Sequence, residues 1–282
     1  MRAMSLSSAL QPRDGPEAVR AHRYAFLAIF WTLIALAWMA LILWQASPYG
    51  RYLDHGEWTA TGLAAALCSA LPDGAVAFLP ALLYAAGWLL MIAAMMLPST
   101  LMLLRLFARL TATRADRRVL IALVVAGYLA IWSVFGVAIH LIDLVLHRAI
   151  LGSPWLAFNA WAIGAGVFVL AGAFQFSRLK YRCLEKCRTP LSFVIEHWRG
   201  RSVRAQSLFL GLHHGLFCVG CCWAVMLVSF ALGTGSIVWM LAIGAVMALE
   251  KNASWGRRLS APLGAFLLAC GGAMALLHFQ PI

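Results

Sequence analysis

The stretch GLHHGLFCVGCCWAVM, residues 211–226, is apolar enough to cross a bilayer, yet it contains three cysteines and two histidines. Polar and nucleophilic side chains on a membrane helix usually face the interior of the bundle, where they serve a partner, an ion or a substrate. Four side chains of this stretch recur every four residues, which places them on one face of a helix. They are His214, Cys218, Cys222 and Met226.

The side chains on this face share a chemical preference, and Cys221, which flanks the face, shares it too. Thiolate and thioether sulfur are soft donors that favour Cu(I), whereas a mixture of cysteine and histidine is also acceptable to Zn(II). Packing alone is the alternative interpretation, because cysteine and methionine are ordinary buried apolar residues. Three cysteines within five residues, one turn from a histidine, favour a metal or redox site, with Cu(I) preferred over Zn(II).

Composition places the chain among integral membrane proteins. Of its 282 residues 63% are hydrophobic and only 11% are charged, and its mean hydropathy is +0.85. A net charge of +12 would suggest nucleic acid as the partner of a soluble domain, but the basic residues lie between apolar runs, where they act as topology signals. We therefore expect a lipid bilayer, and no nucleic acid, as the partner of this chain.

Seven apolar runs predict an all-α fold, a polytopic transmembrane helical bundle that forms one domain over residues 24–278. Residues 1–23 precede it as a disordered cytoplasmic tail. The sixth run is short, so six spans are the alternative. The seven spans are expected near residues 24–44, 76–104, 119–146, 155–176, 207–232, 236–250 and 261–277.

The basic residues between the spans predict the orientation. They concentrate in the N-terminal tail and in the loops around residues 105–118, 177–206 and 251–260, whereas the opposite side has only Arg51 and Arg148. The positive-inside rule then places the N-terminus in the cytoplasm and the C-terminus outside. For a bacterium, this is a multi-pass protein of the inner (cytoplasmic) membrane.

Two further groups of sulfur side chains are candidate metal ligands. Met91, Met95 and Met96 lie on the second expected span, where methionines serve either packing or a soft metal. Cys183 and Cys187 lie in a basic loop, spaced CLEKC. If that loop is helical, one turn brings both thiols onto one face, suited to capturing a soft ion or to forming a reversible disulfide.

A polar group near the outer end of the third expected span is the last candidate. His140, Asp143 and His147 share a helix face there. An acidic side chain inside a span suggests function, because leaving it unpaired in lipid costs several kcal/mol. The alternative is a polar helix end that faces water.

Four motifs of the chain occur together in one known family. They are WLLMIAAMMLPS at residues 88–99, QFSRLKYRCLEKCRTPL at residues 175–191, HGLFCVGCCWAVM at residues 214–226, and the pair Glu250-Lys251. Between residues 83 and 274 the chain thus resembles a bacterial family of predicted metal-binding integral membrane proteins, a domain of unknown function. The resemblance implies metal binding but fixes neither the substrate nor the mechanism.

These observations predict a membrane protein that binds a transition metal ion, Cu(I) by preference, and transports or delivers it. Cys183 and Cys187 would exchange the ion with a cytoplasmic metal carrier, and the other sulfur residues and His214 would hold it in the membrane. One alternative is a membrane thiol–disulfide oxidoreductase. Another is an assembly factor that delivers metal to a membrane metalloenzyme. No catalytic residue is predicted, and an enzyme is the less favoured interpretation.

Overall fold

The computed structural model describes residues 16–47, 78–189, 194, 202–232 and 237–278, and within these ranges it contains helices and no strand. The prediction of an all-α bundle is therefore confirmed. The α-helices are α2 (Pro16–Gln45), α4 (Phe78–Leu110), α5 (Arg117–Gly152), α6 (Pro154–Phe158), α7 (Ala160–Phe174), α8 (Arg178–Arg188), α10 (Val203–Ala231), α11 (Ile237–Asn252) and α12 (Ser260–His278), with the 3-10 helix η2 (Gly256–Leu259) before α12.

Five helices of the described ranges contain a segment long and apolar enough to cross a membrane, in α2, α4, α5, α10 and α12. A sixth is present if α7 and α8, which meet at an angle of 65°, count as one broken span. Helix α11, the expected sixth span, has 16 residues. At about 1.5 Å per residue it is shorter than a hydrocarbon core of about 30 Å. The count of seven spans and the cytoplasmic N-terminus stay predictions.

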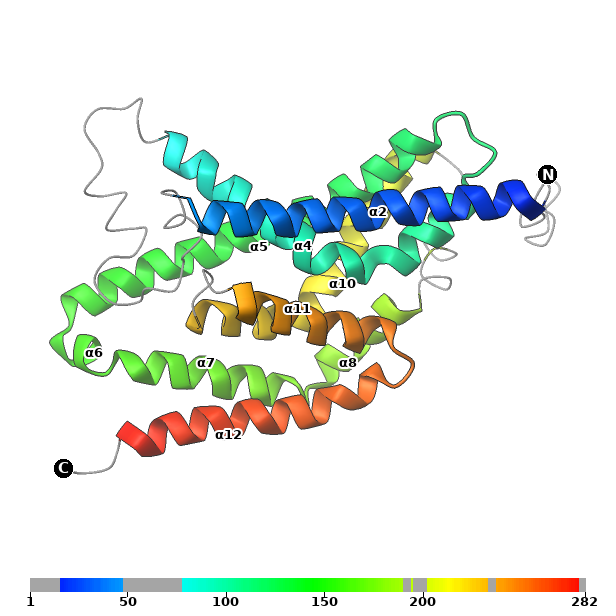
Figure 1. The fold of residues 1–282 in the computed structure, drawn as a ribbon. Coiled ribbons are helices and arrows are strands. Elements are labelled where there is room, and N and C mark those ends of the chain that lie inside the picture. The colour runs from blue at the N-terminus through cyan, green and yellow to red at the C-terminus, as the bar shows by residue number, and fades with distance from the viewer. Residues whose placement is uncertain (1–15, 48–77, 190–193, 195–201, 233–236, 279–282) are drawn as a thin grey trace.

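The connections between the helices lie at two opposite ends of the bundle (Figure 1). The start of α2, the turn from α4 to α5 and the connection from α11 to α12 lie on the right of that view, whereas α6 and the end of α12 lie on the left. The connections on the right include Arg114 and, in η2, Arg257 and Arg258. The positive-inside rule would place this end of the bundle in the cytoplasm, and the orientation stays a prediction.

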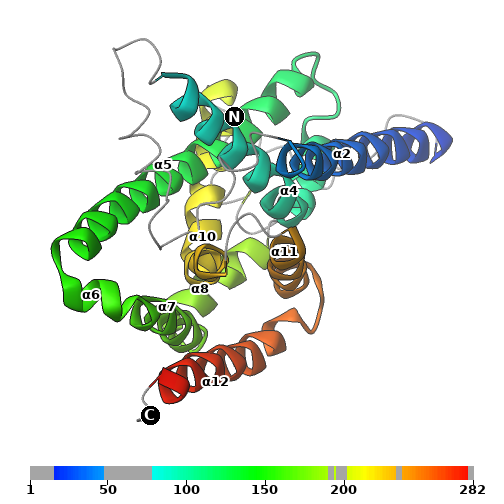
Figure 2. The same ribbon diagram turned by 60° about the vertical axis from the view of Figure 1, so that its left-hand side comes forward.

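Helix α10 occupies the middle of the bundle and contacts α5, α7, α8 and α11 (Figure 2). Glycines let α5 and α10 cross closely. A Cβ atom at Gly127 would overlap the carbonyl of Leu208, and one at Gly211 would overlap the carbonyl of Val124. Small residues at crossing points let the backbones of membrane helices approach each other. The crossing fixes α10 against Tyr128, which follows Gly127 on α5.

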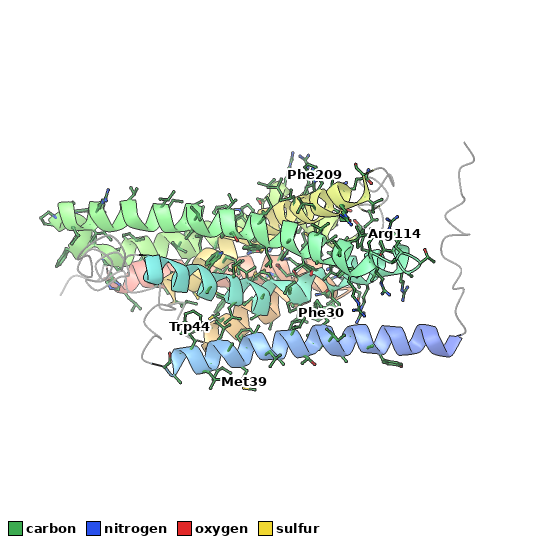
Figure 3. All side chains as sticks on the ribbon, turned by 90° about the horizontal axis from the view of Figure 1, so that it is seen from above. Phe30, Met39, Trp44, Arg114 and Phe209 are labelled. Carbon is green, nitrogen blue, oxygen red and sulfur yellow. The ribbon has the colours of Figure 1, made fainter. Side chains whose placement is uncertain are left out.

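Helix α2 packs on the bundle with one face and presents apolar side chains on the other. Phe30 points toward the bundle and Met39 away from it (Figure 3). Phe30 and Leu41 are buried, whereas Leu33 and Met39 are 59% and 56% exposed. A continuous apolar surface of this kind fits a lipid environment rather than water.

Candidate metal centre

The three cysteines of α10 form the centre of the site, and all three are buried. The thiols of Cys221 and Cys222 donate to the carbonyl oxygen of Cys218, at 3.1 Å and 2.8 Å. In a helix, a short polar side chain commonly donates to the carbonyl oxygen of the residue three or four positions before it. The sulfur atoms consequently point inward from one face and one flank of the helix, as the spacing predicts.

The ammonium group of Lys251, at the end of α11, lies among these thiols. Its Nζ donates to the Sγ of Cys218 at 2.9 Å and to the Oγ of Ser99 at 3.4 Å, and it lies 3.8 Å from the Sγ of Cys222. Only 4% of Lys251 is exposed. A buried ammonium needs an opposite charge or hydrogen-bond acceptors around it, and sulfur atoms supply these contacts.

Tyr128 links the thiols to the histidine of the same helix face. Its hydroxyl group lies 3.0 Å from the Sγ of Cys218 and donates to the carbonyl of Met96 at 3.3 Å. Its ring lies against the imidazole of His214, with 5.9 Å between ring centroids. His214 is buried, so the structure places it beside the sulfur cluster with Tyr128 in contact with both.

The cysteines of the basic loop lie in a helix, α8, and are buried against α10. Cys187, one turn further along α8 than Cys183, belongs to the same buried cluster as Cys221. The Sγ of Cys183 lies over Gly220, where an added Cβ atom would come within 2.8 Å of it. Gly220 therefore makes room for Cys183. The structure thus joins two groups of cysteines that are separate in the sequence.

A buried ion pair holds α8 in this position. The Nζ of Lys180 donates to both carboxylate oxygens of Glu250, at 2.7 Å and 3.0 Å, and to the side-chain oxygen of Gln175. The hydroxyl of Ser260 donates to the same carboxylate at 2.8 Å, and the guanidinium of Arg188 donates to the backbone carbonyl of Glu250. The end of α11, and with it Lys251, is thereby fixed to α8 and α12.

Methionines complete the sulfur-rich core. Met91, Met95 and Met96 on α4 and Met226 on α10 belong to the same cluster of buried side chains as all five cysteines of α8 and α10. Met240 and Met247 on α11 join this cluster. We call the buried sulfur residues of this cluster and Lys251 the thiol–lysine core. Three of the four groups predicted from the sequence therefore meet in space.

The fourth predicted group stays untested. His140, Asp143 and His147 are positions of α5, but their side chains lie outside the described residues. Their role near the far end of the bundle remains a prediction.

The thiol–lysine core contains donor atoms for a soft ion, but its side chains are not in a metal-coordinating arrangement. Within the described ranges, no group of three or more His, Cys, Asp and Glu side chains is placed to hold a metal ion. The thiols of α10 are hydrogen-bonded to the backbone, to Tyr128 and to Lys251 instead. Thiolate and thioether sulfur suit Cu(I). Binding a soft ion with these donors would require the side chains to rearrange.

Sequence reasoning missed the polar residues around the thiols. Lys251, Glu250, Lys180 and Ser99 lie within the motifs on which the family resemblance rests, but the motifs alone gave them no role. Ionisable residues beside an apolar run are the signal that identifies them as functional candidates. Tyr128 lies outside those motifs, and only the crossing of α5 and α10 reveals it.

Replacing Glu250 with Gln will destabilise the protein by about 3–5 kcal/mol, because the ammonium of Lys180 is left buried without its counter-charge. The free energy of unfolding in mixed micelles measures this loss. The double variant Lys180→Met with Glu250→Gln should regain most of it. Asp116→Asn is the matched control, since its ion pair with Arg114, 2.8 Å long, is solvent-exposed and its loss should leave stability nearly unchanged. Equal losses for Glu250→Gln and Asp116→Asn would contradict the structural role of the buried pair.

Comparison with known proteins agrees with the chemistry of the core. No curated protein and no solved structure matches the chain. The profile of the PpoB2 family, described as a copper chaperone, matches residues 85–274. This stretch includes the four motifs and every member of the thiol–lysine core. The expectation of a metal-related family is confirmed, and since the match covers more than half of the 282 residues, the chain belongs to the PpoB2 copper chaperone family.

Proposed function

We propose that this protein is a membrane-embedded copper chaperone that binds Cu(I) in the thiol–lysine core and transports or delivers it. The observation that carries the proposal is the convergence of five cysteines and six methionines in one buried cluster, in a chain of a copper chaperone family. Sulfur donors of this kind favour Cu(I) over Zn(II). Copper is the cargo of this protein and not a resident cofactor.

Cys218 and Cys222 are the proposed primary ligands. They lie one turn apart on α10, and the Nζ of Lys251 is close to both sulfur atoms, at 2.9 Å and 3.8 Å. Two-coordinate sulfur is a favourable environment for Cu(I). Cys221, Met226 and the α4 methionines (Met91, Met95 and Met96) are the proposed additional donors, and His214 is a further one.

The contact between α8 and α10 supports a transfer route. Cys183 and Cys187 would take the ion from a cytoplasmic carrier, or return it, and Cys221, which lies in the same buried cluster, would receive it from Cys187. Each step forms a new copper–sulfur bond as an old one breaks, so the ion crosses from α8 to α10 without water. In this scheme the ion is either released on the far side of the membrane or passed to a membrane metalloenzyme.

The proposed setting is the inner membrane of a bacterium, with the N-terminus in the cytoplasm. The apolar helices and the exposed apolar face of α2 support a bilayer. The basic connections at one end of the bundle support the orientation (Figure 1). In this setting His140, Asp143 and His147 would receive or release the ion on the outer side.

Protein purified anaerobically in detergent and loaded with Cu(I) is expected to contain about one copper per chain, and the Cys218→Ser, Cys222→Ser double variant should lose it. Elemental mass spectrometry measures the metal content of both. Cys270→Ser is the matched control, because Cys270 lies on α12 outside the buried part of the cluster, and it should retain copper. Copper in neither wild type nor control, or equal copper in the double variant, would refute the proposal.

A membrane thiol–disulfide oxidoreductase is the second candidate function. The burial of the α8 cysteines in one cluster with the α10 cysteines favours it, since two thiols that come into contact can form a disulfide when an external oxidant accepts their electrons. The methionines distinguish the two functions, because a thioether can bind Cu(I) but takes no part in disulfide exchange.

Replacing Met95 and Met226 together with Leu should weaken Cu(I) binding by about tenfold, if each thioether contributes a fraction of the sulfur coordination. Leucine keeps the volume and the apolar character of the core. Titration against a chromophoric Cu(I) chelator measures the affinity, and the rate of thiol–disulfide exchange is measured in parallel. Unchanged copper affinity together with a fast exchange reaction that needs Cys187 and Cys221 would favour the oxidoreductase.

A further inference from the structure

We infer that Lys251 makes the thiol–lysine core selective for a monovalent soft ion over a divalent one. This inference rests on the proposed binding of metal by Cys218 and Cys222. It concerns a residue that acts through its charge on the ligands and does not itself bind the metal.

Lys251 brings a positive charge into the core that no carboxylate balances among the residues that the structure describes. The other buried charges there, Lys180 and Glu250, are paired with each other at 2.7 Å. The polar contacts of Lys251 are with uncharged Ser99 and with the sulfur atoms of Cys218 and Cys222. Of the side chains in these contacts, the thiols of Cys218 and Cys222 are the ones that can ionise and balance it.

The charge of the bound ion decides whether the site is neutral. Cu(I) held by two thiolates forms a unit with one negative charge, which the ammonium of Lys251 cancels. A divalent ion held by the same two thiolates forms a neutral unit, so the charge of Lys251 is left buried without compensation. A buried, uncompensated charge is strongly unfavourable. Lys251 thereby favours Cu(I) and opposes Zn(II).

A third thiolate would restore neutrality for a divalent ion, and the structure makes that step costly. Cys221 is the remaining thiol of α10, and it donates to the carbonyl of Cys218 at 3.1 Å. Recruiting Cys221 would break this hydrogen bond, in addition to the one at 2.8 Å that Cys222 gives up, and would ionise one more buried group. Two thiolates and one ammonium reach neutrality with one ionised thiol fewer.

The position of Lys251 is fixed from two sides. Glu250, the preceding residue, is held by Lys180 and Ser260, and Ser99 on α4 lies 3.4 Å from the Nζ of Lys251. The ammonium group is therefore held beside the two sulfur atoms. A fixed counter-charge discriminates between ions of different charge more strongly than a mobile one, because it does not relax away from the ion.

The test compares Ag(I) and Cd(II), two thiol-seeking ions with the same number of electrons and different charge. Their affinities are measured by competition with chelators, for wild type and for variants shown to be folded by size-exclusion chromatography in detergent. Lys251→Met removes the charge. Ser99→Asp keeps Lys251 but places a carboxylate next to it, so it neutralises the same charge in a different way. Lys251→Arg keeps the charge and is the matched control.

The expected result is a fall of at least about tenfold in the ratio of Ag(I) to Cd(II) affinity, both in Lys251→Met and in Ser99→Asp. Lys251→Arg should keep the ratio of the wild type. If Lys251→Met does not fold, Ser99→Asp alone decides. A ratio that stays at the wild-type value in the folded neutralised variants would overturn the role of Lys251 while leaving copper binding intact. Wild-type protein that binds neither ion would overturn the proposed function and this inference together.

Discussion

The contact between the ammonium of Lys251 and the thiols of α10 is the interaction on which the rest of the structure depends. A charge buried in an apolar bundle is tolerated only where other groups compensate it. Lys251 lies 2.9 Å from the Sγ of Cys218, and the neighbouring Glu250 is paired with Lys180. The two neighbouring residues at the end of α11 thus have different roles. Glu250 fixes α8, and Lys251 places a positive charge beside the thiols.

The attachment of α8 changes what its cysteines can do. A thiol on an exposed loop can meet any partner, whereas Cys183 and Cys187 are buried, Cys183 against Gly220 of α10. They belong to one buried cluster with the cysteines of α10 and the methionines of α4. After the bend of 65° between α7 and α8, this short helix contacts α10 and α11. A soft ion bound there would pass between helices by exchange of sulfur ligands and would stay out of water.

The sequence predicts the helical bundle and the inward face of α10, because hydropathy and a repeat of four are local properties. It does not predict that α8 reaches the core, because this depends on Lys180 and Glu250, which are 70 residues apart. The same holds for Tyr128, whose position follows from the crossing of α5 with α10 at Gly127 and Gly211. Pairings between distant segments cannot be read from one sequence, even where each partner belongs to a recognisable motif.

The central claim, that copper is held by the buried sulfur atoms, is tested most directly by X-ray absorption at the copper edge of the wild-type protein, loaded anaerobically with equimolar Cu(I). The account predicts a monovalent copper whose nearest neighbours are sulfur atoms. A first shell of nitrogen and oxygen atoms without sulfur would contradict it, because the thiol–lysine core would then not be the copper site.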